Sequence, residues 1–361
     1  EIMSNKIYPI GIQNFESLRQ DGYFYIDKTA LMYQMVKTGS YYFLSRPRRF
    51  GKSLLISTLE AYFQGKKELF TSLAVEKLEK DWIKHPILHL DLNIEKYDTP
   101  ESLDKILNDN LEYWESQYGT RPSETSFSLR FAGIIQRACE KTGQRVVILV
   151  YDKPMLQAIG NEELQKQFRN TLKPFYGALK TKDGYIKFAL LTGVTKFGKV
   201  SVFSDLNNLD DISMWNEYVE ICGVSEREIH ENLETELHEF AAARGITYDK
   251  LCEDLRECYD GYHFTHNSIG MYNPFSLLNA FKRKEFGSYW FETGTPTYLV
   301  KLLKKHHYDL ERMAHEETDV QVLNSIDSES TNPIPVIYQS GYLTIKGYDE
   351  EFGMYRLGFP N

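Results

Sequence analysis

The sequence predicts an α/β fold: a three-layer domain with a mostly parallel sheet over residues 1–212, followed by a mainly helical domain over residues 213–361. Short β-type runs alternate with segments of helical periodicity in the first part, which is typical of strand–helix–strand units. One of these runs, residues 146–150, is continuously apolar and rich in β-branched residues, as expected of a strand buried on both faces. Helical segments rich in Glu, Leu and Ala dominate from about residue 218 onward.

Within the α/β part, residues 41–44 predict a first strand and residues 54–63 a helix, with Gly65 at the position of a left-handed helix terminator. A second strand is predicted over residues 86–92. It is followed by Thr99 and Pro100, which are typical of the cap and first turn of a helix.

The third strand, residues 146–150, leads into a helical pattern over residues 164–172. Pro174 is expected to kink or end that helix, because proline lacks the N–H that the helix needs. A fourth strand over residues 186–192 ends at Gly193. Right-handed crossovers would place these strands in one parallel sheet.

The second domain is predicted to contain helices over residues 226–243 and 248–259. Two β-type runs, residues 335–338 and 342–345, flank Gln339-Ser340-Gly341 and predict a small terminal β element, so that this domain could be winged-helix-like.

Composition limits the function classes. At 361 residues and 42.2 kDa the chain exceeds the usual single domain of ~100–200 residues, which favours two packed units. No apolar run approaches the ~18 residues of a membrane span, and the first residues lack a secretory pattern, so we expect a cytoplasmic protein without a membrane association. A net charge of −9 argues against wholesale electrostatic binding of nucleic acid. The four cysteines form no CxxC pair, which favours core or surface thiols over metal ligands.

An arginine-rich turn joins the first strand to its helix. It reads Arg46-Pro47-Arg48-Arg49-Phe50-Gly51-Lys52-Ser53. A phosphate-binding P-loop needs backbone amides at a helix N-terminus, a lysine for the β and γ phosphates, and a hydroxyl for magnesium. Gly51, Lys52 and Ser53 supply these groups, although Arg46 stands where the usual motif has a further glycine. The alternative is a plain basic turn.

The turn therefore predicts a nucleoside triphosphate site, most simply for ATP with Mg²⁺. The residues expected to contact the nucleotide are Arg48, Arg49, Phe50, Gly51, Lys52, Ser53 and Leu54. Ser53 is also expected to bind the magnesium ion.

Hydrolysis also needs a carboxylate at the end of a buried strand. Asp152 follows the third strand and is the candidate for magnesium and catalysis, with Asp91 after the second strand in reserve. Thr192, at the end of the fourth strand, is the candidate sensor of the γ-phosphate, and Lys196 and Lys199 follow it. A turn aspartate, a strand-terminal threonine and two surface lysines are the alternatives.

Further motifs are distributed along the chain. They are Tyr25-Ile26-Asp27-Lys28-Thr29, Leu191-Thr192-Gly193-Val194-Thr195-Lys196-Phe197, Ser204-Asp205-Leu206-Asn207-Asn208-Leu209, Tyr259-Asp260-Gly261-Tyr262-His263-Phe264, Tyr272-Asn273-Pro274-Phe275-Ser276 and residues 286–296. Together with the arginine-rich turn, these motifs resemble the bacterial AAA-ATPase-like proteins that carry a PD-(D/E)XK nuclease-superfamily domain at the C-terminus. The resemblance implies ATP binding and a nuclease domain, through which nucleic acid becomes a partner; an oligomer is compatible with it.

The chain departs from that family in two places. Family members carry Asp-Glu, the expected magnesium and water-activating carboxylates, before the Tyr-Asp-Lys-Pro element, whereas Val150 here joins Tyr151 directly. The sequence ends about where the nuclease domain would begin. Residues 91–96 are not a nuclease site, because Glu95 and Lys96 are adjacent and would point to opposite faces of a strand.

Three functions stay open on the sequence. The first is a Mg²⁺-dependent ATPase that acts as a nucleotide switch for an attached nuclease domain or partner. The second is a module that binds ATP without turning it over, because the Asp-Glu pair is absent. The third is a nucleic-acid-binding adaptor. The abundant aromatic residues are expected to be core packing, and His263 a structural residue of an aromatic turn rather than a nucleotide contact.

Overall fold

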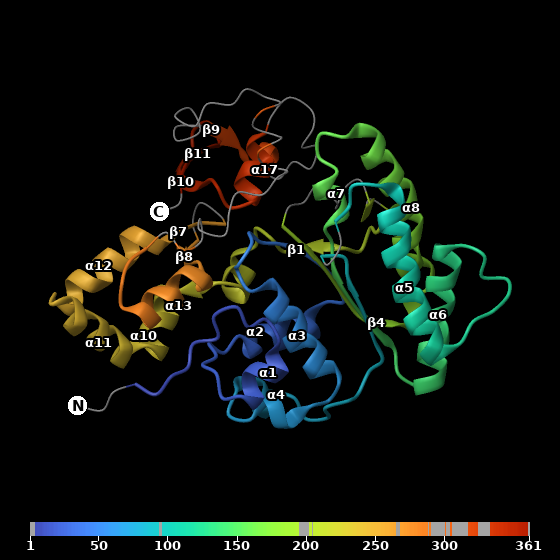
Figure 1. Cartoon of the computed structure of the whole chain (residues 1–361), viewed down its shortest axis with the longest axis horizontal. Helices are drawn as coiled ribbons and strands as arrows, with labels where there is room; N and C mark the ends of the chain where they lie inside the picture. Colours follow the sequence, from blue (N-terminus) through green and yellow to red (C-terminus); the bar gives the residue numbers. More distant parts are fainter. Residues whose placement is uncertain are drawn as a thin grey trace.

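The computed structural model describes residues 4–93, 96–194, 202–203, 205–264, 268–287, 289, 300, 304, 317–323 and 333–359. Three parts are visible in Figure 1: an α/β domain, a helical unit that carries α10 to α13, and a small unit of strands and short helices near the C-terminus. None of the helices within the described ranges combines the length and the apolar character that crossing a bilayer requires.

The central sheet is parallel and has the strand order β2-β3-β4-β1-β5. Its strands are β1 (Tyr41–Ser45), β2 (Ile87–Asp91), β3 (Val146–Tyr151), β4 (Ile186–Gly193) and β5 (Asp210–Asp211). The four strands predicted from the sequence are confirmed. Because β4 lies between β1 and β3, Thr192 pairs with Leu44 on one side and with Tyr151 on the other.

Helices cover both faces of this sheet, which makes the predicted three layers (Figure 1). One layer contains α1 (Phe15–Gln20), α2 (Thr29–Thr38), α3 (Lys52–Phe63), the 3₁₀ turn η1 (Lys67–Phe70) and α4 (Ala74–Leu78). The other contains α5 (Pro100–Tyr118), α6 (Phe127–Thr142), α7 (Pro154–Gln157), α8 (Glu162–Thr181) and the 3₁₀ turn η2 (Asp183–Tyr185). Successive strand residues alternate between the two cores: Phe188 packs with the α2–α3 layer and Ala189 with the α5–α8 layer.

Pro174 does not end α8, which continues to Thr181. The residues after the proline, Phe175, Tyr176 and Leu179, are buried in the α5–α8 core. Their burial outweighs the lost backbone hydrogen bond, which a proline removes from a helix interior.

The helical unit contains the 3₁₀ segment η3 (Asn216–Ile221), β6 (Val224–Ser225), α10 (Glu226–Asn232), α11 (Glu234–Arg244), α12 (Tyr248–Tyr259), β7 (Asp260–Tyr262), β8 (Met271–Tyr272) and α13 (Pro274–Arg283). The single helix predicted over residues 226–243 is in fact two helices. Leu233 interrupts it with non-helical backbone angles, and its buried side chain joins the core of this unit. The helix predicted over residues 248–259 is confirmed as α12.

The C-terminal part contains β9 (Glu317–Asp319), α16 (Val320–Leu323), α17 (Ile334–Gln339), β10 (Thr344–Asp349) and β11 (Met354–Gly358). The strand predicted over residues 335–338 is wrong, because this run is the helix α17, with Pro335 in its first turn. Side chains of α17, β10 and β11 complete the α5–α8 core of the α/β domain. The division of the chain at residue 212 stays a prediction, and residues 288 and 290–296 of the family pattern lie outside the described residues.

Candidate functional site

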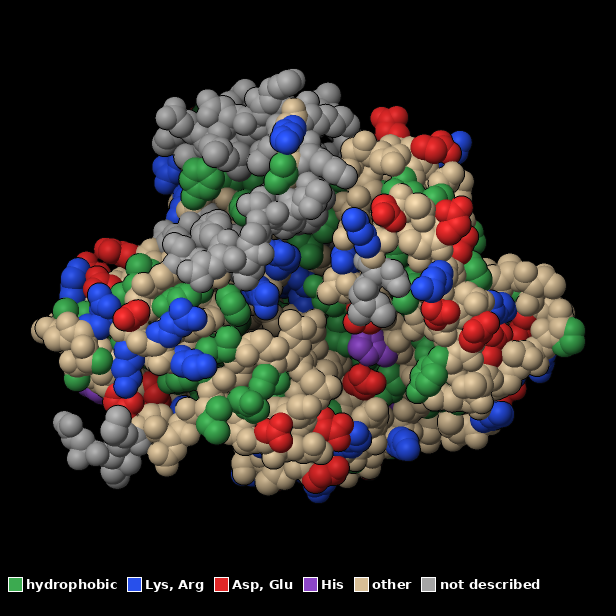
Figure 2. All heavy atoms as spheres, in the orientation of Figure 1, with side chains coloured by type: hydrophobic (Ala, Val, Ile, Leu, Met, Phe, Trp, Pro, Cys, Tyr) green, Lys and Arg blue, Asp and Glu red, His purple; other side chains and the backbone are tan. Residues whose placement is uncertain are grey.

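A large cavity opens at the carboxyl ends of the parallel strands, the edge where ligands of α/β sheets bind. Its volume is about 1370 Å³, above the ~300–1,000 Å³ of common small-molecule pockets. The lining comes mainly from residues 9–13, 48–49, 51–54, 93 and 96–98, from residues between 151 and 164, and from Pro274, Phe275 and Leu278 of α13. Lys and Arg side chains gather at the hollow between the parts in Figure 2.

The arginine-rich turn connects β1 to α3, and the residue directly before α3 has a left-handed backbone conformation. Gly51 has φ 95°, which only glycine adopts readily, and α3 begins directly after it with Lys52. Lys52 and Ser53 therefore stand in the first turn of a 12-residue helix, and both line the cavity. Unpaired backbone N–H groups and the helix dipole make such a position favourable for an anion.

Lys52 is 3% exposed, and its ammonium group stays inside the turn. Its Nζ donates to the backbone oxygens of Arg46 and Pro47, and it lies 5.6 Å from the ring centre of Tyr151. Burial, aided by the charges of Arg46 and Arg48, lowers the pKa of Lys52 to about 7. A negatively charged ligand beside this amine would reverse that effect.

Arg46 takes the place of the missing glycine but does not reach the cavity. Its guanidinium is buried, donates to the backbone oxygens of Ser213 and Tyr218, and lies 4.0 Å from the ring centre of Phe264. Arg46 thus joins the turn to the helical unit. Arg48 and Arg49, which are predicted to contact the nucleotide, both line the cavity.

Phe50, predicted to contact the nucleotide, is 1% exposed and packs edge-to-face on Tyr262 and Phe264 at centroid distances of 5.0 and 5.8 Å. It lines a second, almost wholly apolar cavity of about 100 Å³ that shares Gly51 and Leu54 with the large one. Leu54 therefore lines both cavities.

Asp152 and Thr192 lie next to each other, but neither lines the large cavity. The Asp152 amide donates to the Thr192 carbonyl at 2.8 Å, and the Thr192 hydroxyl donates to the Val150 carbonyl at 3.1 Å. The buried Oδ1 of Asp152 has no hydrogen-bond partner among the described residues, and burial raises the pKa of this carboxyl to about 7. Because neighbouring strand residues point to opposite faces, the side chain that meets Lys52 is Tyr151.

Comparison with known proteins agrees with this architecture. A family described as "Predicted AAA-ATPase" matches residues 9–203. The chain belongs to the AAA-ATPase-like family. A relative from Azotobacter chroococcum mcd 1, named "Uncharacterized protein in vnfD 5'region", is 38% identical over 366 residues, which cover 99% of this chain and 68% of the relative. The family description supports a nucleotide-binding, ATPase-like role.

In this AAA-ATPase-like chain, the carboxylates of the described cavity lining do not form a metal site. Ser53 lines the cavity as required, whereas the only acidic residues in the described lining are Asp98 and Glu162. No group of three or more His, Cys, Asp and Glu side chains that could hold a metal occurs among the described residues. Asp91, the reserve candidate, accepts a hydrogen bond from the Asn93 amide at 2.9 Å. The groups that would bind a magnesium ion here are the phosphate oxygens of the nucleotide and the Ser53 hydroxyl.

Other predicted residues of the AAA-ATPase-like chain lie away from the cavity or cannot be placed. The His263 amide donates to the Thr344 hydroxyl at 2.8 Å, and its side chain is not part of the cavity lining. Lys196 and Lys199 lie outside the described residues. The four cysteines carry free thiols, and Cys222 is buried in the α2–α3 core.

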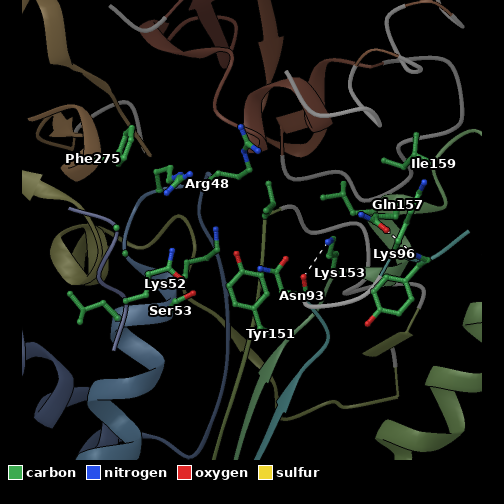
Figure 3. A pocket seen from close by; sticks show the side chains of 18 of the residues that line it. Arg48, Lys52, Ser53, Asn93, Lys96, Tyr151, Lys153, Gln157, Ile159 and Phe275 are labelled. Carbon is green, nitrogen blue, oxygen red and sulfur yellow. Dashed lines mark hydrogen bonds between the residues drawn. The ribbon is translucent and has the colours of Figure 1, made fainter. Parts of the chain in front are cut away.

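Several lining residues were missed by the sequence reasoning. Tyr151 is the last residue of β3, Lys153 and Gln157 follow that strand, and Asn93 and Lys96 follow β2 (Figure 3). Their position after predicted strands was a usable signal, because the carboxyl ends of parallel strands share one edge. No local signal pointed to residues 9–13 or to Phe275.

Proposed function

We propose that this protein binds ATP in the large cavity, with the triphosphate over the first turn of α3. The observation that carries this proposal is the placement of Lys52 and Ser53, which open α3 inside a cation-lined cavity at the carboxyl edge of a parallel sheet. When bound, Mg²⁺ would neutralise phosphate charge beside the Ser53 hydroxyl. Arg48 and Arg49 would supply further positive charge.

The small apolar cavity is the proposed place of the base. It borders the turn at Gly51 and Leu54, and Pro9, Phe24 and Leu278 contribute apolar surface to it. The surface of this cavity is almost all apolar, which suits a flat purine ring. Residues from the N-terminal segment and from α13 of the helical unit would then enclose the base.

A route for a nucleotide switch runs through the same turn. Lys52 donates to the carbonyls of Arg46 and Pro47. Arg46 is anchored to the helical unit, and Pro47 lies against Gly341, where an added Cβ would be only 2.8 Å from the Pro47 Cβ. A triphosphate would compete for the Lys52 ammonium, so binding would change the contacts that hold the turn to the two other parts.

An attached nuclease-superfamily domain or a protein partner in the bacterial cytoplasm is the proposed recipient of this switch. A nucleic-acid-binding adaptor is a further proposal, tested by a salt-dependent shift of labelled DNA.

A module that holds ATP without turnover is the second candidate, and one observation favours it. Tyr151 occupies the end of β3 that faces Lys52, while the Asp152 carboxyl is buried elsewhere. The expected water-activating carboxylate is therefore absent from the described lining next to the turn.

Calorimetry with ATP and Mg²⁺, followed by steady-state phosphate release, tests both candidates. We expect binding that Lys52→Ala weakens at least tenfold, and tight binding without phosphate release would favour the second candidate. Rapid phosphate release abolished by Lys52→Ala would favour the ATPase. The absence of any purine triphosphate binding by folded wild-type protein would refute the proposal.

A further inference from the structure

An ion pair joins the α/β domain to the helical unit beside the small apolar cavity. The Lys28 ammonium donates to both carboxylate oxygens of Glu228, at 2.6 and 2.8 Å. Lys28 directly precedes α2, whereas Glu228 belongs to α10, so the pair connects two of the parts visible in Figure 1. Both side chains are largely buried, with exposed fractions of 14% and 7%. The proposed contacts of the triphosphate do not involve this pair.

Lys28 is held in place by the segment around it, which is the motif of residues 25–29. One oxygen of the Asp27 carboxylate accepts from the Thr29 amide and hydroxyl, at 2.8 and 2.6 Å. The other oxygen accepts from the Ala74 amide at 2.8 Å. The acid next to Lys28 in the sequence is therefore bonded to other donors, and the ammonium bonds to its partner in α10 instead.

Glu228 is bonded on its other side to the segment that forms one wall of the cavity. Its Oε1 accepts from the Ser225 amide at 3.0 Å, and the Ser225 hydroxyl accepts from the Glu228 amide at 3.2 Å, which makes a capping box at the start of α10. Ser225 directly follows residues 221–224, which line the small cavity. A chain of polar contacts therefore runs from Lys28 through Glu228 to this wall.

The same wall packs closely on the arginine-rich turn. Gly223 has φ +93°, and a Cβ added there would lie 3.1 Å from the Phe50 ring and 3.2 Å from the Met271 side chain. Residues 221–224 therefore have little room to move towards the turn, while the Lys28–Glu228 pair ties them to the start of α2.

The small cavity lies between the two parts of the protein. Its lining includes Met32, Leu55 and Thr58 from the α/β domain and residues 221–224 and Leu278 from the helical unit. Lys28 lines it as well, and because its ammonium is bonded to Glu228, it offers the cavity its hydrocarbon stem. Since the walls belong to both parts, the width of the cavity depends on how these parts are held together.

We propose that the Lys28–Glu228 ion pair positions the two walls of the small cavity and so controls the affinity for the purine base, while the turn before α3 binds the phosphates. Lys28 is a positioning residue that acts through Glu228 and residues 221–224. This role rests on the proposed function, which places the base in this cavity. A bound base would touch both walls, so base binding and the intact ion pair should favour each other.

Calorimetric titrations with ATP and with inorganic tripolyphosphate, both with Mg²⁺, test this role, because tripolyphosphate lacks the base. Lys28→Met keeps an unbranched apolar side chain and removes the charge. We expect it to weaken ATP binding at least tenfold and to leave tripolyphosphate binding within about twofold of the wild type. Lys28→Met also leaves a buried carboxylate unpaired, which costs stability. Glu228→Gln, which keeps an acceptor for the Ser225 amide, is therefore the second variant and should give the same result.

Arg130→Met is the matched control. Arg130 pairs with Glu115 at 2.6 Å, and the two side chains are 17% and 10% exposed, similar to the pair at Lys28. Neither residue belongs to the described lining of the two cavities. Both affinities of this variant should stay within about twofold of the wild type, although it loses a buried ion pair. Thermal unfolding of each variant confirms that it is folded.

The outcomes separate the role of the ion pair from the proposed function. Equal weakening of ATP and tripolyphosphate in the folded variants, or unchanged ATP binding in them, would overturn this role and leave the nucleotide proposal standing. Equal affinities of the wild-type chain for ATP and tripolyphosphate would also overturn it, because the base would then contribute nothing. Failure of the folded wild type to bind either ligand would instead refute the proposed function itself.

Discussion

Protonation of Lys52 should be coupled to nucleotide binding. In the free chain its amine is buried, bonded only to the carbonyls of Arg46 and Pro47 among the described residues, and has a pKa of about 7. The fall from 10.5 corresponds to a free energy of the order of 5 kcal/mol that disfavours the ammonium form. A triphosphate beside the amine would supply the opposite charge and raise the pKa again.

The size of the effect follows from the two pKa values. At pH 8 roughly nine in ten free chains carry a neutral Lys52 amine, so binding should take up about 0.9 proton per ATP. Apparent affinity should fall by up to about tenfold for each pH unit above 7, and should change little from this group below pH 6.

Calorimetry at pH 8 in two buffers with different heats of ionisation measures this proton uptake. Lys52→Arg is the matched control, because its guanidinium stays charged and should show an uptake near zero. Equal heats in both buffers, with ATP binding intact in the wild type, would refute the reasoning.

The Lys52 amine should also make the free energy of unfolding depend on pH, in a direction set by its lowered pKa. Its folded pKa is lowered, so between pH 7 and 10.5 the unfolded chain binds a proton that the folded chain does not. The contribution of Lys52 to the free energy of unfolding of the ligand-free protein should therefore rise with pH across that window. Lys52→Met should remove this part of the pH dependence in urea unfolding.

Three further predictions concern stability, measured by urea unfolding. Burial raises the pKa of the Asp152 carboxyl to about 7, so the free energy of unfolding should fall as pH rises from 3.8 to 7. Asp152→Asn should therefore stabilise the protein by about 2 kcal/mol at pH 8 and by little at pH 5. An equal effect at both pH values would contradict this assignment. Arg46→Met should cost about 3 kcal/mol because it removes buried hydrogen bonds to three backbone carbonyls, those of Ser45, Ser213 and Tyr218, and a loss below about 1 kcal/mol would be inconsistent with this. Gly341→Ala should cost about 2 kcal/mol, since φ is +98° and the new Cβ would lie 2.8 Å from Pro47, whereas Gly184→Ala, with open space around it, should be nearly neutral.

The strands of the sheet were predictable because apolar, β-branched runs report burial directly. The helix α3 and the turn before it were predictable for a similar reason, since Gly51 and Lys52 carry backbone and charge requirements in themselves. The end of α8 was not, because Pro174 gives a local signal that the burial of later residues overrides. The run at residues 335–338 was equally ambiguous, since short apolar segments suit strand or helix.

The sequence by itself determined the alternation of strands and helices and the Gly-Lys-Ser turn, because periodicity and backbone freedom are local properties of the chain. Only the tertiary structure decided that β4 lies between β1 and β3, that Arg46 is buried against Phe264, and that Tyr151 rather than Asp152 faces Lys52. These features depend on strand register and on contacts between residues far apart in the chain. Burial and electrostatics act through space, so the chemistry of the cavity was set by neighbours that sequence spacing does not reveal.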